Sequence, residues 1–238
     1  MPAMARVTSA SIGALALTAA LALTGCAGTT RDTPSGAVAI KTATPAEALQ
    51  LLRRGNERFV AGRLVHQDLL AQVATTSKGQ KPYAVVLGCI DSRVPPEIVF
   101  DQGIGDIFVG RVAGNFVSTD MLGSFEFATE LTGSQLIVVL GHSECGAVKG
   151  ACDGAKLGNL THTLANIMPA VEAVKTDGER NSSNKKFVQA VAEENVRLTV
   201  DRMTEKSPVM SALVEQGKLT VVGAMYDVAT GKVTFMDS

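Results

Sequence analysis

Two short apolar runs in this 238-residue chain each lead into a block of side chains suited to metal binding or catalysis. Residues 83–87 precede Gly88-Cys89-Ile90-Asp91-Ser92-Arg93, and residues 136–140 precede Gly141-His142-Ser143-Glu144-Cys145-Gly146. Such uninterrupted apolar runs are typical of buried strands. In a parallel α/β sheet, ligands collect beyond the carboxyl ends of the strands. The two blocks are therefore predicted to meet at one site.

Two thiols, an imidazole and a carboxylate make a natural zinc site. A structural zinc site usually fills four positions with Cys or His, and the two blocks offer three such residues. With Cys89, His142 and Cys145 as ligands, the fourth position is left for water, substrate or Asp91, as in catalytic zinc sites. Arg93 decides between these states, because pairing with the carboxylate leaves the position to water.

Two alternatives remain at this point. The Asp91–Arg93 pair can be a partly buried ion pair that only fixes the loop. In an oxidising compartment, a Cys89–Cys145 disulfide competes with the metal site. The disulfide leaves His142, Asp91 and Arg93 without a role, so the zinc interpretation explains more of the sequence.

The first 25 residues differ from the rest of the chain. Arg6 precedes the uncharged apolar stretch 12–23, which is too short to span a bilayer comfortably and is typical of a secretory signal. Leu23-Thr24-Gly25-Cys26 resembles a bacterial lipobox, which predicts cleavage before Cys26 and lipidation of its thiol. An ordinary cleaved signal peptide or an uncleaved anchor is the alternative. Each interpretation exports the protein, and the lipobox places it in the cell envelope, at the periplasmic or outer surface, as a membrane-anchored lipoprotein.

The remaining chain divides into a tether and one domain. Residues 26–43, rich in Gly, Thr, Ser and Ala, are expected to be the lipidated cysteine and a flexible tether. Residues 44–238 suffice for one domain with a full core. The net charge of −1 gives no indication of a nucleic-acid partner, and membrane contact is expected only through the lipid anchor.

Strands and helices alternate at short intervals, which predicts an α/β fold with a mostly parallel central sheet flanked by helices. Helices are expected over residues 45–61, 95–100, 121–131, 160–174, 185–206 and 208–216, strands over 83–87, 107–109, 136–140, 219–226 and 232–235, and loops over 63–81 and 177–186.

The two blocks together resemble the β-class carbonic anhydrases. The runs 108–115, 125–128 and 223–227 are also similar to family patterns, so the resemblance covers most of residues 44–238. It implies reversible hydration of CO2 to bicarbonate and a proton. It also implies a fold that dimerises, as a homodimer or homotetramer, so that each active cleft borrows residues from its partner.

Carried over by position, the resemblance implies that Cys89, His142 and Cys145 bind one Zn2+ per subunit. Asp91 and Arg93 would form a catalytic dyad that orients a zinc-bound hydroxide toward CO2. Zinc can lower the pKa of bound water to about 7, which agrees with this assignment.

The resemblance further implies three substrate contacts. Gln80 matches a substrate-binding glutamine, Phe108 matches an apolar wall of the CO2 pocket, and Gly146 belongs to the second block. An apolar pocket beside the nucleophile suits CO2.

Three positions qualify the resemblance. Phe127 stands where many family members have Tyr, which removes a hydroxyl from the cleft. Val86 stands where the subclass with an allosteric bicarbonate site carries Trp, so that site is expected to be absent although Arg111 matches its Arg. The resemblance still allows the loop to switch Asp91 onto the zinc at low pH, as in some family members, so activity is expected to rise with pH.

Other side chains and other functions stay open. His66 and His162 are candidate proton shuttles, although surface histidines are more common, and Cys152 is expected to be a buried helix thiol. The rival functions are hydrolysis of a CO2 analogue, such as carbonyl sulfide or carbon disulfide, and zinc binding without catalysis in a lipoprotein.

Overall fold

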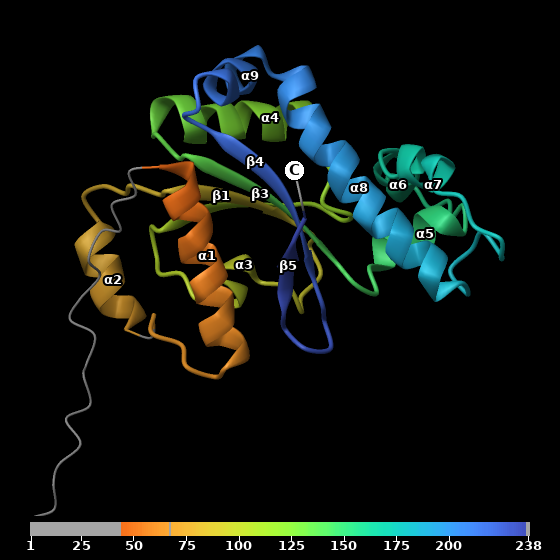
Figure 1. Ribbon diagram of the computed structural model, residues 1–238, viewed down its shortest axis with the longest axis horizontal. Helices are drawn as coiled ribbons and strands as arrows, with labels where there is room; N and C mark the ends of the chain where they lie inside the picture. The colour runs from red at the N-terminus through yellow and green to blue at the C-terminus, as the bar shows by residue number, and fades with distance from the viewer. Residues whose placement is uncertain (1–43, 67, 237–238) are drawn as a thin grey trace, which may run out of the picture. The chain divides into compact units, whose positions relative to one another are not determined.

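One five-stranded sheet organises the computed structural model, which describes residues 44–66 and 68–236 (Figure 1). The spatial order is β2-β1-β3-β4-β5; the first four strands are parallel and β5 is antiparallel to β4. The mostly parallel sheet flanked by helices is thus confirmed. The strands are β1 (Ala84–Gly88), β2 (Ile107–Arg111), β3 (Leu136–His142), β4 (Thr220–Tyr226) and β5 (Val233–Phe235).

Helices cover both faces of this sheet. The described helices are α1 (Pro45–Val60), α2 (Leu69–Thr76), α3 (Pro96–Val99), α4 (Thr119–Glu126), the π-helix η1 (Phe127–Leu131), α5 (Gly146–Cys152), α6 (Leu160–Ala165), α7 (Met168–Ala173), α8 (Lys185–Lys206) and α9 (Pro208–Glu215). α1 and α3 pack on one face, and α4, α8 and α9 pack on the other. α5, α6 and α7 pack together and against α8 (Figure 1).

The central strands β1 and β3 are buried on both sides, as their uninterrupted apolar sequences predict. Val86 pairs in register with Val138, and both contribute to the core under α1. Their neighbours Val85 and Ile137 point to the opposite core, under α4, α8 and α9. Since successive side chains of a strand alternate between faces, one apolar run supplies both cores.

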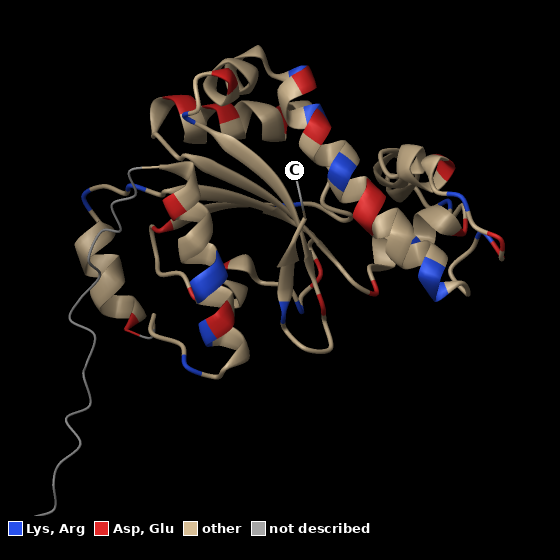
Figure 2. Cartoon of the chain, viewed as in Figure 1, with Lys and Arg blue, Asp and Glu red and all other residues tan. Residues whose placement is uncertain are grey.

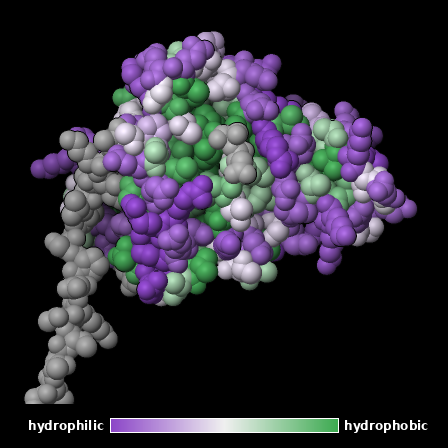
Figure 3. Space-filling view, viewed as in Figure 1, coloured by the Kyte–Doolittle hydropathy of each residue, from purple (hydrophilic) through white to green (hydrophobic). Residues whose placement is uncertain are grey.

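The helices that cover the sheet are polar on the outside. Acidic and basic residues follow one another along α8 (Figure 2), while Val191 and Val196 of this helix are fully buried. Figure 3 shows hydrophilic surface over α1 and α8, with apolar residues in the band between them. This distribution is typical of helices that bury one face against a sheet.

A short helix lies where the sequence predicts a loop over residues 63–81. Asp68 caps α2 through its side chain. The segment contains several β-branched residues, which lower helix propensity. However, buried Gln72 accepts a hydrogen bond of 2.8 Å from the Ile104 N–H, which ties α2 to the loop before β2. The expected loop was therefore wrong, because a tertiary contact stabilises the helix.

Two other predicted helices differ in detail. Residues 160–174 form two helices, α6 and α7, because Pro169 has no N–H and its ring would clash with the carbonyl of Ala165, where α6 ends. The helix expected over 121–131 begins earlier, at a cap made by Ser118, and finishes as a π-helix.

The expected leader and tether, including Cys26, lie outside the described residues. Among the residues that are described, no helix has the length and apolar character needed to cross a membrane.

Candidate metal centre

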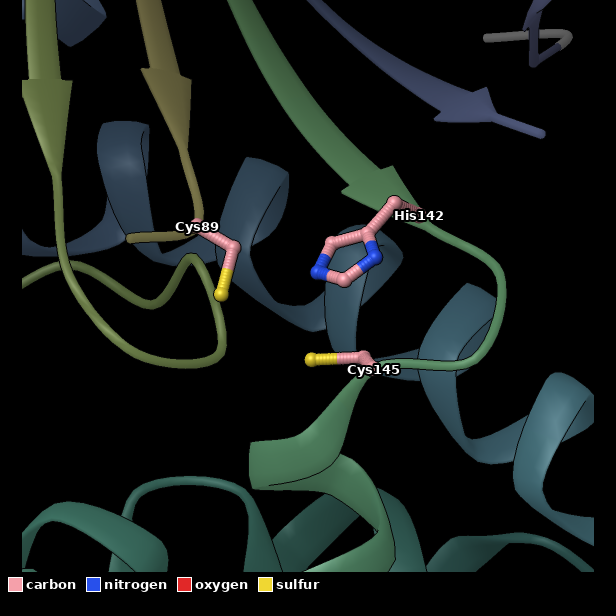
Figure 4. A group of neighbouring side chains, drawn as sticks. All are labelled: Cys89, His142 and Cys145. Atoms are coloured by element: carbon pink, nitrogen blue, oxygen red, sulfur yellow. The ribbon is translucent and has the colours of Figure 1, made fainter. Parts of the chain in front are cut away.

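Three potential metal ligands converge at the carboxyl ends of β1 and β3. Cys89 follows β1, His142 is the last residue of β3, and Cys145 immediately precedes α5. Their side chains point toward a common centre (Figure 4), where one ligand atom from each lies within 4.8 Å of the other two. β1 and β3 pair in register up to Gly88 and Leu140, so the two strands end side by side. The ligand group predicted from the sequence is therefore brought together.

The imidazole of His142 is prepared for a ligand role. The ring is fully buried, and its Nδ1 lies 2.9 Å from the carbonyl oxygen of Ser143. This contact requires the proton on Nδ1, which leaves a lone pair on Nε2. Within the described part of the chain, Nε2 is buried without a hydrogen-bond partner. A buried nitrogen of this kind is costly unless a cation or donor occupies the space beside it.

The two thiols lie close enough for each to shift the pKa of the other. The hydrogen bond with Cys145 is the largest influence that lowers the pKa of the Cys89 thiol, helped by His142 and the Gly114 N–H and opposed by burial. The same contact with Cys89, together with burial, raises the pKa of Cys145. Two adjacent buried thiols cannot both ionise easily without a positive charge. Two thiolates and a neutral imidazole fit a zinc ion, which would supply that charge.

An ion pair lies beside the ligands. Arg93 donates to Asp91 through Nε at 2.9 Å and Nη2 at 2.8 Å, so the guanidinium binds both carboxylate oxygens. These hydrogen bonds hold the pKa of Asp91 well below its usual range. Asp91 Oδ2 lies 4.0 Å from His142 Nε2. An ionised acceptor is therefore held at the edge of the ligand group.

The backbone between Cys89 and Asp91 is fixed from β2. Arg111 donates to the carbonyl of Cys89 through Nε at 2.8 Å and to the carbonyl of Asp91 through Nη2 at 2.6 Å. The resemblance associates Arg111 with an allosteric site, but here its guanidinium serves two backbone carbonyls of the first block. The sequence contained no local signal for this role.

The turn between His142 and Cys145 is anchored to β4 and the residues after it. The Ser143 N–H donates to the Tyr226 carbonyl at 2.9 Å, and the Ser143 hydroxyl accepts from the Val228 N–H at 3.1 Å. Glu144 has a φ of +57°, a left-handed conformation that is uncommon for a residue other than glycine. The anchored neighbours hold this turn, and with it the carbonyl that His142 contacts.

The predicted substrate residues lie in two places. Gly146 begins α5 directly after Cys145, beside the ligand group. Gln80 precedes β1 at the opposite end of the parallel strands, close to Gly105. The five residues of β1 alone span about 16 Å. One chain therefore does not bring Gln80 to its own ligand group.

Phe108 lies on the edge strand β2, where its ring meets Phe127 edge-on at a centroid distance of 6.3 Å. His66 is also remote from the ligands, with Nδ1 3.8 Å from Asp106 Oδ2 before β2. His162 is exposed on α6, and Cys152 is a buried thiol in α5, as expected.

Comparison with known proteins gives a consistent result. The family model described as carbonic anhydrase matches residues 84–233. Carbonic anhydrase 2 of Mycobacterium tuberculosis is 38% identical over 199 residues, which cover 81% of this chain and 93% of the relative.

Solved structures are similar over most of their length. The β-carbonic anhydrase CafA of Aspergillus fumigatus has a TM-score of 0.61 at 28% identity, covering 81% of this chain and 90% of that one. A structure from a study of two tetrameric β-carbonic anhydrases of Sordaria macrospora has a TM-score of 0.61 at 26% identity, covering 81% and 96%.

Proposed function

Since this chain belongs to the carbonic anhydrase family and is an enzyme of that kind, we propose that it hydrates CO2 reversibly at a zinc ion held by Cys89, His142 and Cys145. The β-carbonic anhydrase fold expected from the sequence is confirmed. The zinc assignment rests on one observation: these three buried side chains meet at one point, where His142 Nε2 has no hydrogen-bond partner in the described residues. When bound, zinc would supply the Lewis acidity that makes water a nucleophile near neutral pH.

Asp91 and Arg93 would form the catalytic dyad. Arg93 keeps the Asp91 carboxylate ionised and turned to accept hydrogen bonds. Asp91 Oδ2, beside the ligand group, is the atom assigned to accept a hydrogen bond from the attacking oxygen and so direct a lone pair of that oxygen at CO2. Arg111 keeps this carboxylate in place by holding the backbone of residues 89–91.

A second copy of the chain would complete the cleft. β2 is an edge strand, with β1 as its neighbour among the described strands. If two copies pair antiparallel through β2, the beginning of one strand meets the end of the other. Gln80 and Phe108 would then approach the ligand group of the partner. The tetrameric β-carbonic anhydrases of Sordaria macrospora support this proposal of a homodimer or homotetramer.

The leader supports a proposal on location. Lipidation at Cys26 would anchor the enzyme in the cell envelope, on the periplasmic or outer surface. Mass spectrometry of the membrane-bound protein should show a chain that begins at Cys26 and carries lipid on its thiol, whereas an unmodified thiol at Cys26 would contradict lipidation.

Stopped-flow CO2 hydration near pH 8.5 tests the activity. The protein lacking residues 1–26, with measured zinc content, is compared with its Cys89→Ser variant. Fast hydration that disappears in the variant is expected. Absence of hydration by protein shown to contain zinc would contradict the proposal, and assays with carbonyl sulfide and carbon disulfide would then test the rival hydrolase.

A further inference from the structure

The thiol of Cys89 receives a hydrogen bond from a loop that precedes α4. The Gly114 N–H donates to Cys89 Sγ at a distance of 3.3 Å. A backbone N–H directed at a thiolate partly balances its charge and fixes the direction of its lone pairs. The placement of Gly114 therefore bears on how Cys89 can hold a metal.

This loop has a conformation that needs support from its surroundings. Gly114 and Asn115 are both left-handed, with φ values of +87° and +42°. A side-chain carbon at residue 114 would lie 2.4 Å from Cδ1 of Ile167, so the loop is pressed closely against the segment before α7. Such a conformation persists only where neighbouring groups specify it.

A single side chain on α8 supplies a specific contact. Asn195 Nδ2 donates to the Gly114 carbonyl at 2.8 Å, and Asn195 is only 1% exposed. The residues are 81 positions apart. The carbonyl and the N–H of Gly114 flank the same Cα, so a hydrogen bond to the carbonyl also limits rotation of the N–H away from Cys89.

We propose that Asn195 is a positioning residue for the metal centre, which holds Gly114 so that its N–H is directed at Cys89 Sγ. The inference rests on the proposed zinc function. Asn195 donates to the backbone of the loop, so its effect on Cys89 passes through Gly114. Loss of its amide should leave Cys89 free to rotate and weaken metal retention, while the three ligands themselves remain.

The test compares two variants with the wild type. Asn195→Leu keeps a similar side-chain volume without a hydrogen-bond donor, and Asn195→Ala decides the result if Asn195→Leu fails to fold. Thr199→Val is the matched control. Thr199 lies one turn further along α8, is fully buried, and has a hydroxyl without a hydrogen-bond partner in the described residues. The control therefore removes a buried polar group from the same helix without touching Gly114.

Zinc affinity is measured by competition with a chelator, and the cobalt-substituted proteins are compared by their thiolate-to-metal absorption. The Asn195 variants should bind zinc roughly tenfold more weakly and show an altered thiolate band, whereas Thr199→Val should resemble the wild type in both. Thermal unfolding of the metal-free proteins checks that each variant is folded.

Folded Asn195 variants with wild-type zinc affinity and an unchanged cobalt spectrum would overturn the inference. An equal loss in Thr199→Val would also overturn it, because the effect would then be general to α8. Failure of the wild-type chain to bind zinc would instead refute the proposed function, so the two failures are distinguishable.

Discussion

The two blocks that follow β1 and β3 both supply a cysteine, but their surroundings differ. In the first block, the Arg93 side chain is 51% exposed and forms an ion pair with Asp91. In the second, His142 is fully buried and its neighbour Ser143 is tied to the backbone after β4. The second block supplies two potential metal ligands on an anchored turn, while the first supplies one and adds the Asp91–Arg93 ion pair beside it. The first block thus combines one proposed ligand, Cys89, with the proposed dyad, whereas the second supplies proposed ligands alone, and the predictions below test that division.

The largest effect is expected from the loss of a proposed ligand, tested here in the second block. Cys145→Ser should remove zinc and abolish CO2 hydration, because Cys89 and His142 would be the two proposed protein ligands that remain. Zinc content and stopped-flow hydration measure both losses. Cys152→Ser is the matched control, since Cys152 is a buried thiol of α5 outside the ligand group. Retention of zinc and activity by Cys145→Ser would contradict the assignment.

A change in the first block should separate binding from catalysis. Asp91→Asn should keep zinc but slow CO2 hydration by about 10²-fold or more, because the ionised acceptor is lost. Glu144→Gln, which changes an exposed carboxylate in the second block, should leave the rate near that of the wild type. If Asp91→Asn loses zinc along with activity, the carboxylate is a ligand and the division between the blocks fails.

The pH profile sharpens the same comparison. Arg93 lowers the pKa of Asp91, so this carboxylate is already ionised across the neutral range and cannot produce an acid limb there. The hydration rate should instead fall about tenfold per pH unit below its midpoint, because the hydroxide that attacks CO2 would then be converted to water. Arg93→Gln lets the pKa of Asp91 rise toward its ordinary value, which is still acidic. The variant should therefore hydrate CO2 more slowly at every pH, with the midpoint of the pH–rate profile unchanged. A shifted midpoint would show that Asp91 sets it.

The smallest effect is expected from the anchor of the second block. Ser143→Ala removes the hydroxyl that accepts from the Val228 N–H but keeps the carbonyl that contacts His142. Zinc affinity should fall by at most about tenfold, as measured by chelator competition. Ser211→Ala, which changes a half-buried serine of α9, is the control. A loss as large as that of Cys145→Ser would mean that the whole turn depends on one hydroxyl.

Several parts of the fold and site follow from local sequence. The apolar runs before Cys89 and His142 predict buried strands, and parallel strands end at one edge, so the ligand group could be inferred without coordinates. The loop expected over 63–81 failed because α2 depends on Gln72, whose partner Ile104 lies in a distant segment. Pro169 did carry a local signal for the break between α6 and α7.

The sequence by itself indicated the potential metal ligands and the sheet, because a strand and the residue after it are neighbours in the chain. Only the tertiary structure decided which groups support them. Arg111 reaches the carbonyl of Cys89 across the β1–β2 pair, and Asn195 reaches Gly114 from a helix 81 residues away. The tertiary structure also placed Gln80 at the far end of β1. Hydrogen bonds between distant segments depend on how helices pack on the sheet, and no periodicity or spacing in the chain encodes them directly.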